Sequence, residues 1–548
     1  FATFFMTLLF LLMLSVAESQ EETTNYELLD PFGFVGTQAI ILEMTNAAKN
    51  TTYLPIEGPL LLNRIGWTLL GLVIFVLGYL RFDFKDFLMG KGKVAKTAAP
   101  PQDDPVLVQG PIAVTKAFGS ATLIKKRWCI SKSEFLQIAR PASFRVLLLI
   151  IGLMILIFNL SGNAAYHVGH TIPLSTTMTH FRFVFGGFIM LLLMVWAGEL
   201  FFSDRTTNIW QITDALPVPL WISKLAKLFA MVGVSAVVVA TFILVGMLSQ
   251  LLQGAPDLIE LRVYALDFLI YNWSFLTYIQ QIAWVFFIAG LTQNRFLTHI
   301  ISVSFFVVLT VSFEYGLIEE LRYGYSFTTG LEDYSELSAY RHFTESANWY
   351  FLMWLFLSIL FVLLGIHFWN RGSGQSWAKK WRFRGRQLSG GGKAFAAAML
   401  LGFILTRIHI IDQVYTQGNF VSTAQREADA ADYERRYHFL TEVLQPKYRR
   451  VDLHFDFYPS QRSAEYEARI TLLNPDSLRS IDSLYLDFPD FVAIQQLTLD
   501  QTAVRPSRVD EQYGMYVYTQ TAHLYPGGKK KWNLEGKNKY RGIKKGIR

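Results

Sequence analysis

Long apolar stretches separated by polar loops dominate the first three quarters of the chain. The stretches lie at residues 1–16, 62–80, 144–160, 181–202, 228–252, 275–291, 296–313, 349–368 and 394–411. Each is close to the roughly 20 residues that an α-helix needs to cross a hydrocarbon layer of about 30 Å. The pattern therefore predicts a mainly α protein, a polytopic transmembrane helix bundle.

The pattern changes after residue 432 to an alternation of apolar and polar residues. Val451, Leu453, Phe455 and Phe457 share one face of the first run, and a second run at 466–472 repeats the pattern. A period of two residues is typical of half-buried antiparallel strands. We therefore expect a small antiparallel β domain at 432–548.

The end of this predicted domain is harder to interpret. Few strands share a core before Arg548, so we expect the native domain to continue beyond the chain. Beyond Pro526 the alternation is lost in a Lys-rich segment. That segment is either a genuine surface segment or a corrupted reading frame, and the sequence leaves both interpretations open.

The basic residues favour one topology. The chain has a net charge of +7, and its Lys and Arg residues concentrate in two loops, 81–143 and 371–393, the second of which has no acidic residue. Both loops are therefore expected to be cytoplasmic, with six helices between them at 144–370. The connecting helix 394–412 then leads to an extracytoplasmic β domain. The protein is expected in the plasma (inner) membrane, with its basic surplus facing membrane lipid and not nucleic acid.

The segment 198–227 is the most specific feature of the membrane part. It contains the charged residues Glu199, Asp204, Arg205 and Asp214. It also contains apolar residues at helical spacing, Ile209, Ile212 and Leu216, which are followed by the helix-ending residues Pro217 and Pro219. This pattern predicts a short amphipathic helix along the membrane that offers its surface to a cytoplasmic partner. An interfacial loop anchored by Trp210 and Trp221 is the equally supported alternative.

This segment resembles the cytoplasmic coupling element of permease subunits from ABC transporters of the type-two export class. The matching residues are Gly198-Glu199, Asp204-Arg205 and Ala215-Leu216-Pro217-Val218, with Asp30-Pro31-Phe32-Gly33 and Leu61-Leu62-Asn63-Arg64 ahead of Trp67. The resemblance covers roughly residues 20–415. It implies coupling to a separate cytoplasmic ABC ATPase subunit through Glu199, Asp204, Arg205, Asp214, Ala215, Leu216 and Pro217.

The same resemblance implies how the helices are grouped. Residues 144–370 would form a complete six-helix permease half, and residues 1–80 would hold the last two helices of a preceding half. The assembly would be a homodimer or a pseudo-dimer. Residues 1–16 are accordingly expected to be a helix cut by an incomplete N-terminus, with a signal peptide as the alternative.

The β part resembles the N-terminal β-domain of the zinc aminopeptidases related to membrane alanyl aminopeptidase. The matching residues are Val451-Asp452-Leu453, Tyr458-Pro459, Arg462, Leu472-Leu473-Asn474, Ile481-Asp482-Ser483-Leu484 and, more loosely, Tyr525-Pro526-Gly527. The whole chain thus resembles a bacterial fusion of such a permease with such a domain. The alternative function is a membrane-anchored zinc aminopeptidase whose catalytic domain lies outside this chain.

Catalytic motifs are absent from the sequence. The aminopeptidases hold zinc with His-Glu-x-x-His, and no His here is followed by Glu, so we predict no catalytic and no metal-binding residue. The lone Cys129 excludes an intramolecular disulfide. Gly392-Lys393 is followed by Ala394 instead of the Ser or Thr of a P-loop. ATP is therefore expected on the partner subunit, and zinc only in a downstream peptidase domain.

Overall fold

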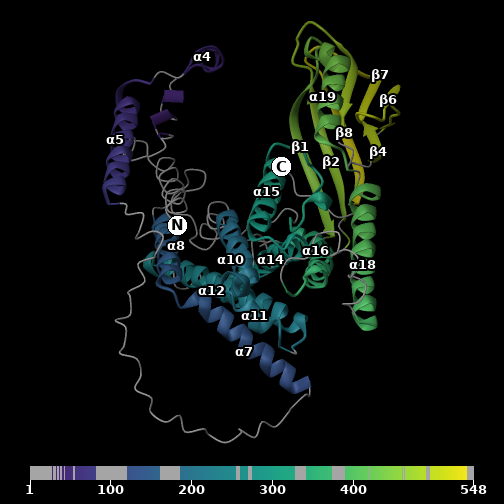
Figure 1. The fold of residues 1–548 in the computed structure, drawn as a ribbon. Coiled ribbons are helices and arrows are strands. Elements are labelled where there is room, and N and C mark those ends of the chain that lie inside the picture. The colour runs from purple at the N-terminus through teal and green to yellow at the C-terminus, as the bar shows by residue number, and fades with distance from the viewer. Residues whose placement is uncertain are drawn as a thin grey trace, which may run out of the picture. The chain divides into compact units, whose positions relative to one another are not determined.

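A computed structural model gives the fold of the chain (Figure 1). It describes residues 28, 33, 36–37, 40–41, 44–53, 56–81, 120–160, 186–216, 218–254, 259–269, 275–327, 341–372, 389–418, 420–458, 461, 463–488, 494–500 and 502–539. The chain divides into two compact units. The first is Phe1–Phe306, Leu331–Tyr340 and Ser358–Ala396, and the second is Val307–Gly330, Arg341–Leu357 and Ala397–Arg548.

Helices account for the apolar stretches, as predicted. The long ones are α5 (Gly58–Arg81), α8 (Ala142–Leu160), α10 (Gly186–Thr206), α12 (Leu220–Leu252), α14 (Phe275–Thr292), α15 (Arg295–Glu314), α16 (Arg341–Phe368) and α18 (Gly390–Ile411). Within the described residues seven helices are long and apolar enough to cross a membrane, and α7 (Ser120–Ala139) with α8 makes an eighth if this bent pair is counted as one span. The protein is a polytopic membrane protein. The predicted helix at 1–16 lies outside the described residues.

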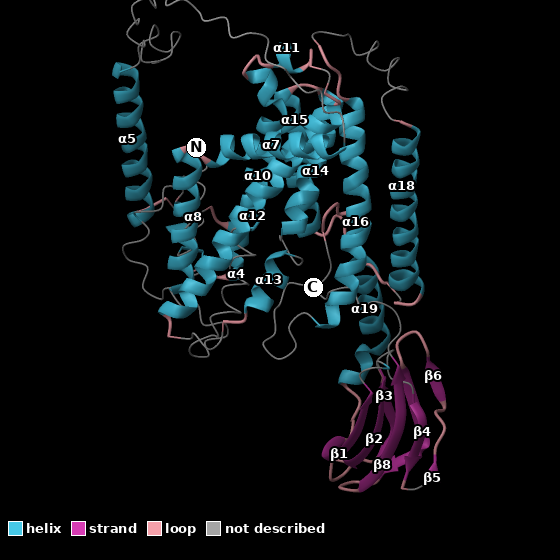
Figure 2. Cartoon of the chain, turned by 90° about the horizontal axis from the view of Figure 1, so that it is seen from below, coloured by secondary structure: helices cyan, strands magenta, loops and turns pink. Residues whose placement is uncertain are grey.

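Shorter helices lie before, between and after the long ones. They are α4 (Asn46–Thr51), α11 (Trp210–Thr213), α13 (Leu261–Leu269), the single turn η4 (Leu321–Tyr323), the π-helical turn η6 (Asp412–Thr416), α19 (Thr423–Tyr437) and η7 (His438–Thr441). Figure 2 shows helices and strands in separate parts of the chain, and among the described residues the strands all follow α19.

The core of the first unit lies between α10, α12 and α14. Met190 and Leu193 of α10, Met231 and Val234 of α12, and Val285 of α14 are fully buried. Glycine permits α14 and α16 to approach closely, because a Cβ on Gly290 would lie 2.1 Å from the carbonyl oxygen of Gly365 in α16. Small residues at such crossings are how membrane helices pack closely.

Helix α7 (Ser120–Ala139) corrects the sequence analysis, which placed residues 81–143 in a basic loop and linker. It meets α8 at an angle of 66° and packs against α12, where the Ser131 hydroxyl donates to the carbonyl of Ala226 at 2.8 Å. Phe135 lies against Gly233. The helix carries exposed lysines among its apolar residues, so its sequence contains no continuous apolar run that would predict it.

The strands form two antiparallel sheets. One has the order β1-β2-β8-β4-β5 and the other β3-β7-β6. Their bounds are β1 (Lys447–Tyr458), β2 (Ser463–Leu473), β3 (Ile481–Asp487), β4 (Ile494–Leu499), β5 (Thr502–Ala503), β6 (Arg508–Asp510), β7 (Met515–Leu524) and β8 (Lys529–Lys539). The core residues between them include Ala468, Leu484, Tyr518 and Trp532. A C-terminal antiparallel β domain was predicted, and the two sheets confirm it.

One segment that the β prediction left open is a strand, and one detail of the prediction was wrong. The Lys-rich segment after Pro526 forms β8, which pairs with both β2 and β4, and its Trp532 and Leu534 are buried. Strand β1 pairs with β2 as expected, but each residue of β1 is exposed. The buried core draws on β2, β3, β4, β7 and β8 and includes no residue of β1, so the predicted half-burial of the first run does not occur.

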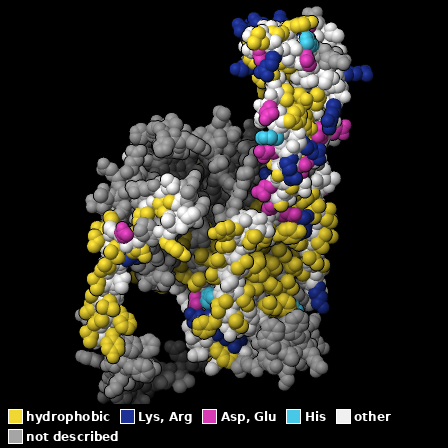
Figure 3. All heavy atoms as spheres, turned by 90° about the horizontal axis from the view of Figure 1, so that it is seen from above, with side chains coloured by type: hydrophobic (Ala, Val, Ile, Leu, Met, Phe, Trp, Pro, Cys, Tyr) yellow, Lys and Arg dark blue, Asp and Glu magenta, His cyan; other side chains and the backbone are white. Residues whose placement is uncertain are grey.

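The two kinds of surface differ in character. In Figure 3 hydrophobic side chains gather over the helices, whereas charged side chains are dense over α19 and the sheets. Helix α5 is apolar and exposed around most of its circumference, as in a helix that contacts lipid on several sides.

Candidate functional site

The segment 199–219 comprises the end of α10 and its connection to α12, and we call it the α11 corner. Helix α10 ends at Thr206, and Asn208 then adopts a left-handed backbone conformation with φ of 58°. Asn tolerates this conformation better than most residues, and it reverses the chain after a helix. Helix α11 is a single turn of four residues, so the structure lies between the amphipathic helix and the interfacial loop that the sequence predicts.

The apolar series of the α11 corner points outward. Ile209, Ile212 and Leu216 are 51%, 69% and 47% exposed, and Ala215 is exposed beside them. Pro217 lies outside the described residues. An apolar series left uncovered on a short, charged turn is suited to contact either a partner protein or the membrane surface.

Arg205 fixes the corner from within. Its guanidinium donates to the carbonyls of Gly372 at 3.0 Å and Asn370 at 3.3 Å, and it lies 3.4 Å from the carboxylate of Asp214. Asp214 also accepts the backbone N–H of Gly372 at 2.9 Å. Arg205 and Asp214, nine residues apart in the sequence, thereby attach the turn after α10 to the chain that leaves α16.

Aromatic rings complete the surroundings of Arg205. Its guanidinium carbon lies 4.6 Å from the ring centre of Trp210 and 5.4 Å from that of Trp369. Cations are attracted to the faces of such rings. Trp210 therefore contacts Arg205 within the corner, a role in addition to the interfacial anchoring that the sequence suggests.

Glu199 makes a second set of polar contacts, one helical turn and a half earlier in α10. Its Oε1 accepts from Nε of Arg295 at 2.8 Å and lies 3.0 Å from Nε2 of His299. Both partners belong to the first two turns of α15. Gly198 leaves room for this arrangement, because a Cβ there would come within 2.5 Å of the His299 ring.

Asp204 joins a buried network that the sequence analysis missed. The Lys227 ammonium, which has no exposure, lies 2.9 Å from Asp204 and 3.6 Å from Glu134 of α7. It also donates to the Ser203 hydroxyl at 2.6 Å and to the Leu200 carbonyl at 3.0 Å. The network connects α7, α10 and α12 at one place.

Lys224 lies one turn before Lys227 and is 3% exposed. Its ammonium donates to the carbonyl of Phe201 at 3.1 Å and lies 4.0 Å from the ring centre of Trp369. Two lysines three residues apart at the start of an apolar helix share one side of that helix. This spacing was the feature of the sequence from which the two buried lysines could have been predicted.

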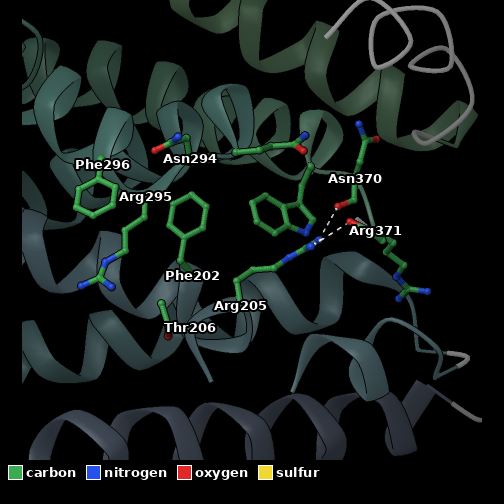
Figure 4. A pocket seen from close by; sticks show the side chains of 11 residues that line it. Phe202, Arg205, Thr206, Asn294, Arg295, Phe296, Asn370 and Arg371 are labelled. Carbon is green, nitrogen blue, oxygen red and sulfur yellow. Dashed lines mark hydrogen bonds between the residues drawn. The ribbon is translucent and has the colours of Figure 1, made fainter. Parts of the chain in front are cut away.

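A pocket of about 410 Å³ opens beside Arg205 (Figure 4). Residues from the end of α10, from the α14–α15 connection and from the chain after α16 line it: Phe202, Arg205, Thr206, Gln293, Asn294, Arg295, Phe296, Trp369, Asn370, Arg371 and Gly372. The Arg295 side chain points away from that of Arg205 in Figure 4. The arginines therefore do not converge on a single anion position.

The predicted coupling residues thus divide into two groups. Glu199, Asp204, Arg205 and Asp214 have their carboxylates and guanidinium engaged within the protein, whereas Ala215 and Leu216 face outward. The charged members position the corner and the apolar members form its surface. Within the described ranges, no three His, Cys, Asp or Glu residues gather as a metal site would require.

The α11 corner is thus held by internal polar contacts and has an exposed apolar edge. A pocket lies beside Arg205, and a buried ion network includes Asp204. The polar groups of the corner hold it directly or through Lys227 to four other chain segments: α7, α12, α15 and the chain after α16. Comparison with known protein families, with curated proteins and with solved structures found no match for this chain.

Proposed function

We propose that this polytopic membrane protein is the permease subunit of an ABC transporter and that a separate cytoplasmic ATPase docks on the α11 corner. The observation that carries the proposal is the exposed series Ile209, Ile212 and Leu216 on a turn that Arg205 and Asp214 hold in place. An element that passes the motion of an ATPase to the helices needs an apolar surface for contact and internal bonds that keep its shape. The proposal places the corner in the cytoplasm and the β domain outside the cytoplasm.

The internal contacts of the corner support a mechanical role. A push on α11 would move the end of α10 through the peptide connection and the chain after α16 through Arg205. It would reach α12 through the Asp204–Lys227 pair. The partner shifts the bundle between states by binding one arrangement of these helix ends better than the other.

A photo-reactive amino acid at Ile212 tests the contact directly. The full chain is expressed in its native membrane, irradiated and purified, and the cross-linked protein is identified by mass spectrometry. We expect an ATPase that carries a P-loop. The matched control is the same label at Leu317, which is 77% exposed and follows α15, at the opposite end of that helix from Arg295.

Substitution gives the quantitative arm of the test. Ile212→Glu places a charge in the apolar contact and should abolish co-purification of the ATPase, while Leu317→Glu should leave it unchanged. Labelling of lipid alone at Ile212, with ATPase retention unaffected by Ile212→Glu, would sink the proposal in favour of a membrane-interface loop.

The topology has its own test. A cysteine-reactive, membrane-impermeant reagent applied to intact cells should label Leu478→Cys, in the β domain, and not Ile212→Cys, both in a Cys129→Ser background. Leu478 is 89% exposed, so access does not limit its reaction. Labelling of Ile212→Cys from outside would place the α11 corner on the wrong side for an ATPase.

A further inference from the structure

Strand β1 forms one edge of the five-stranded sheet. It pairs with β2 over its whole length, and no described strand pairs with its other side. All twelve of its residues are exposed. A long edge strand presents unpaired N–H and C=O groups that can pair with another strand.

One face of β1 is apolar. Val451, Leu453, Phe455 and Phe457 are 46%, 56%, 44% and 70% exposed. They extend the apolar face of the sheet, because Leu453 lies opposite Ala468 of β2, which lies opposite the buried Leu534 of β8. The buried face of the sheet therefore runs on into an uncovered row at its edge.

The other face of β1 carries alternating charge. Arg450 lies 2.8 Å from Asp452, and His454 lies 3.7 Å from Asp456. Asp456 lies opposite Glu465 of β2, an acid beside an acid. Glu465 has its own partner in Lys537 of β8. Directly opposed like charges destabilise a sheet, so Asp456 would gain from a cation on its other side.

We propose that β1 pairs antiparallel with β1 of a second copy of this chain, about a two-fold axis at Leu453. This register overlaps the strands almost completely. It sets Arg450 opposite Asp456 of the second copy and Asp452 opposite His454 of the second copy. On the apolar face it sets Val451 opposite Phe455 and Leu453 opposite itself, as a self-complementary two-fold contact requires.

The charges select this register. Residues that face each other across antiparallel strands lie on the same face of the sheet, so the next possible registers differ by two residues. One neighbour sets Asp452 opposite Asp452, and the other sets Asp452 opposite Asp456. Both bring acids together. Of these three registers, only the one centred on Leu453 sets Arg450 opposite an acid and leaves neither Asp452 nor Asp456 opposite another acid.

An edge strand can also be protected from pairing by its charges. Protection needs charges that reject an identical strand. The charges of β1 instead match those of a copy in the full-overlap register, and they alternate with large apolar residues that water would otherwise cover. These two properties favour a second copy as the occupant.

Cysteine cross-linking in the full-length membrane protein tests the pairing. Leu453→Cys in a Cys129→Ser background should form a disulfide-linked dimer on mild oxidation, because directly opposed α-carbons of antiparallel strands lie about 4.5–5.5 Å apart, within the range of about 4.4–6.8 Å that a disulfide spans. Leu478→Cys in the same background is the control for chance collision and should stay monomeric. Failure of Leu453→Cys to cross-link, or equal cross-linking of Leu478→Cys, overturns the proposal.

Charge reversal identifies the partner strand. Asp456→Arg in the Leu453→Cys background sets Arg opposite Arg450 of the second copy and should lower the yield of dimer about tenfold. Adding Arg450→Asp reverses both charges and should restore the yield. If the double variant stays as poor as the single one, the strand on β1 belongs to another protein and self-pairing is wrong.

Discussion

The ammonium nitrogen of Lys227 lies 2.9 Å from the carboxylate of Asp204, and the Lys227 side chain has no contact with solvent. Glu134 of α7 approaches the same ammonium to 3.6 Å. A lysine this deep in a membrane protein needs anionic partners and hydrogen-bond acceptors to remain charged. The contact between Glu134 and Lys227 therefore explains why α7, whose own sequence is only weakly apolar, is held against α12.

Lys227→Met should destabilise the protein strongly. It leaves Asp204 and Glu134 near each other without a cation, and we expect a loss of about 3 kcal/mol, the lower end for a broken buried pair because both carboxylates keep some solvent contact. The measurement is the thermal unfolding midpoint in detergent. Lys132→Met, which removes an exposed lysine of α7, should change the midpoint little.

A triple variant separates charge from packing. Lys227→Met with Asp204→Asn and Glu134→Gln removes the ammonium and both carboxylates, so much of the lost stability should return. If the triple variant is as unstable as Lys227→Met alone, the network holds α7 by shape and not by charge.

Gly290→Ala should disturb the crossing of α14 and α16. The added Cβ would meet the backbone carbonyl oxygen of Gly365 at 2.1 Å, and a backbone atom cannot turn away as a side chain can. We expect the two helices to separate, with a loss of about 2 kcal/mol, within the range for overpacking.

The control for that prediction is Gly71→Ala in α5, where nothing lies within 4 Å of the new Cβ. Its helix propensity should stabilise α5 by about 0.5–1 kcal/mol. Unfolding in detergent, followed by circular dichroism, measures both variants. A Gly290→Ala protein as stable as Gly71→Ala would mean that the crossing is looser than the structure has it.

How much of this protein the sequence predicts depends on the length scale of the signal. Continuous apolar runs of about 20 residues predicted α14 and α15 almost to their bounds, because a span through lipid requires that length, whereas α12 begins well before its predicted start. Helix α7 and strand β8 were missed for a common reason. Each carries its apolar residues on one side only, among lysines that raise the average polarity of the segment.

The residues of the candidate site could be predicted from the sequence, but their contact partners could not. Glu199, Asp204, Arg205 and Asp214 could be singled out as charges near the end of an apolar helix. Their partners come from α7, α12, α15 and the chain after α16, at separations of up to 167 residues. Local patterns carry no information on such pairs, since only packing brings them together.

The turn after β2 should lose its order in acid. Asp476 accepts the backbone N–H groups of Leu478 at 2.8 Å and Arg479 at 3.1 Å, and it lies 2.7 Å from Nε of Arg479. The two backbone N–H donors, together with the Arg479 guanidinium, lower the pKa of Asp476 to about 2.

Because this pKa is lower when the turn is formed than when it is open, ionised Asp476 stabilises the turn above the ordinary pKa of about 3.9. That stabilisation should be lost as the pH falls from about 4 to about 2. Hydrogen exchange at the amides of Leu478 and Arg479 in the full chain follows it. Asp476→Asn keeps the accepting oxygen, so it should preserve the turn near neutral pH while removing this pH dependence, whereas Asp476→Ala should open the turn at every pH.

Arg205→Lys should weaken the α11 corner although it keeps the charge. The guanidinium reaches the carbonyls of Asn370 and Gly372 and the carboxylate of Asp214 at once, and a lysine ammonium lacks the planar fork that serves three acceptors. We expect a loss of about 1.5 kcal/mol, typical of hydrogen bonds to a charged group.

Arg371→Lys is the matched control, because the Arg371 guanidinium donates to the carbonyl of Val218, a single acceptor that an ammonium can also serve. Limited proteolysis after Arg371 and Lys393 in detergent reports how firmly the chain after α16 is held, and it should accelerate in Arg205→Lys alone. Equal acceleration in both variants would show that the general loss of arginine, and not the three-acceptor geometry of Arg205, loosens the corner.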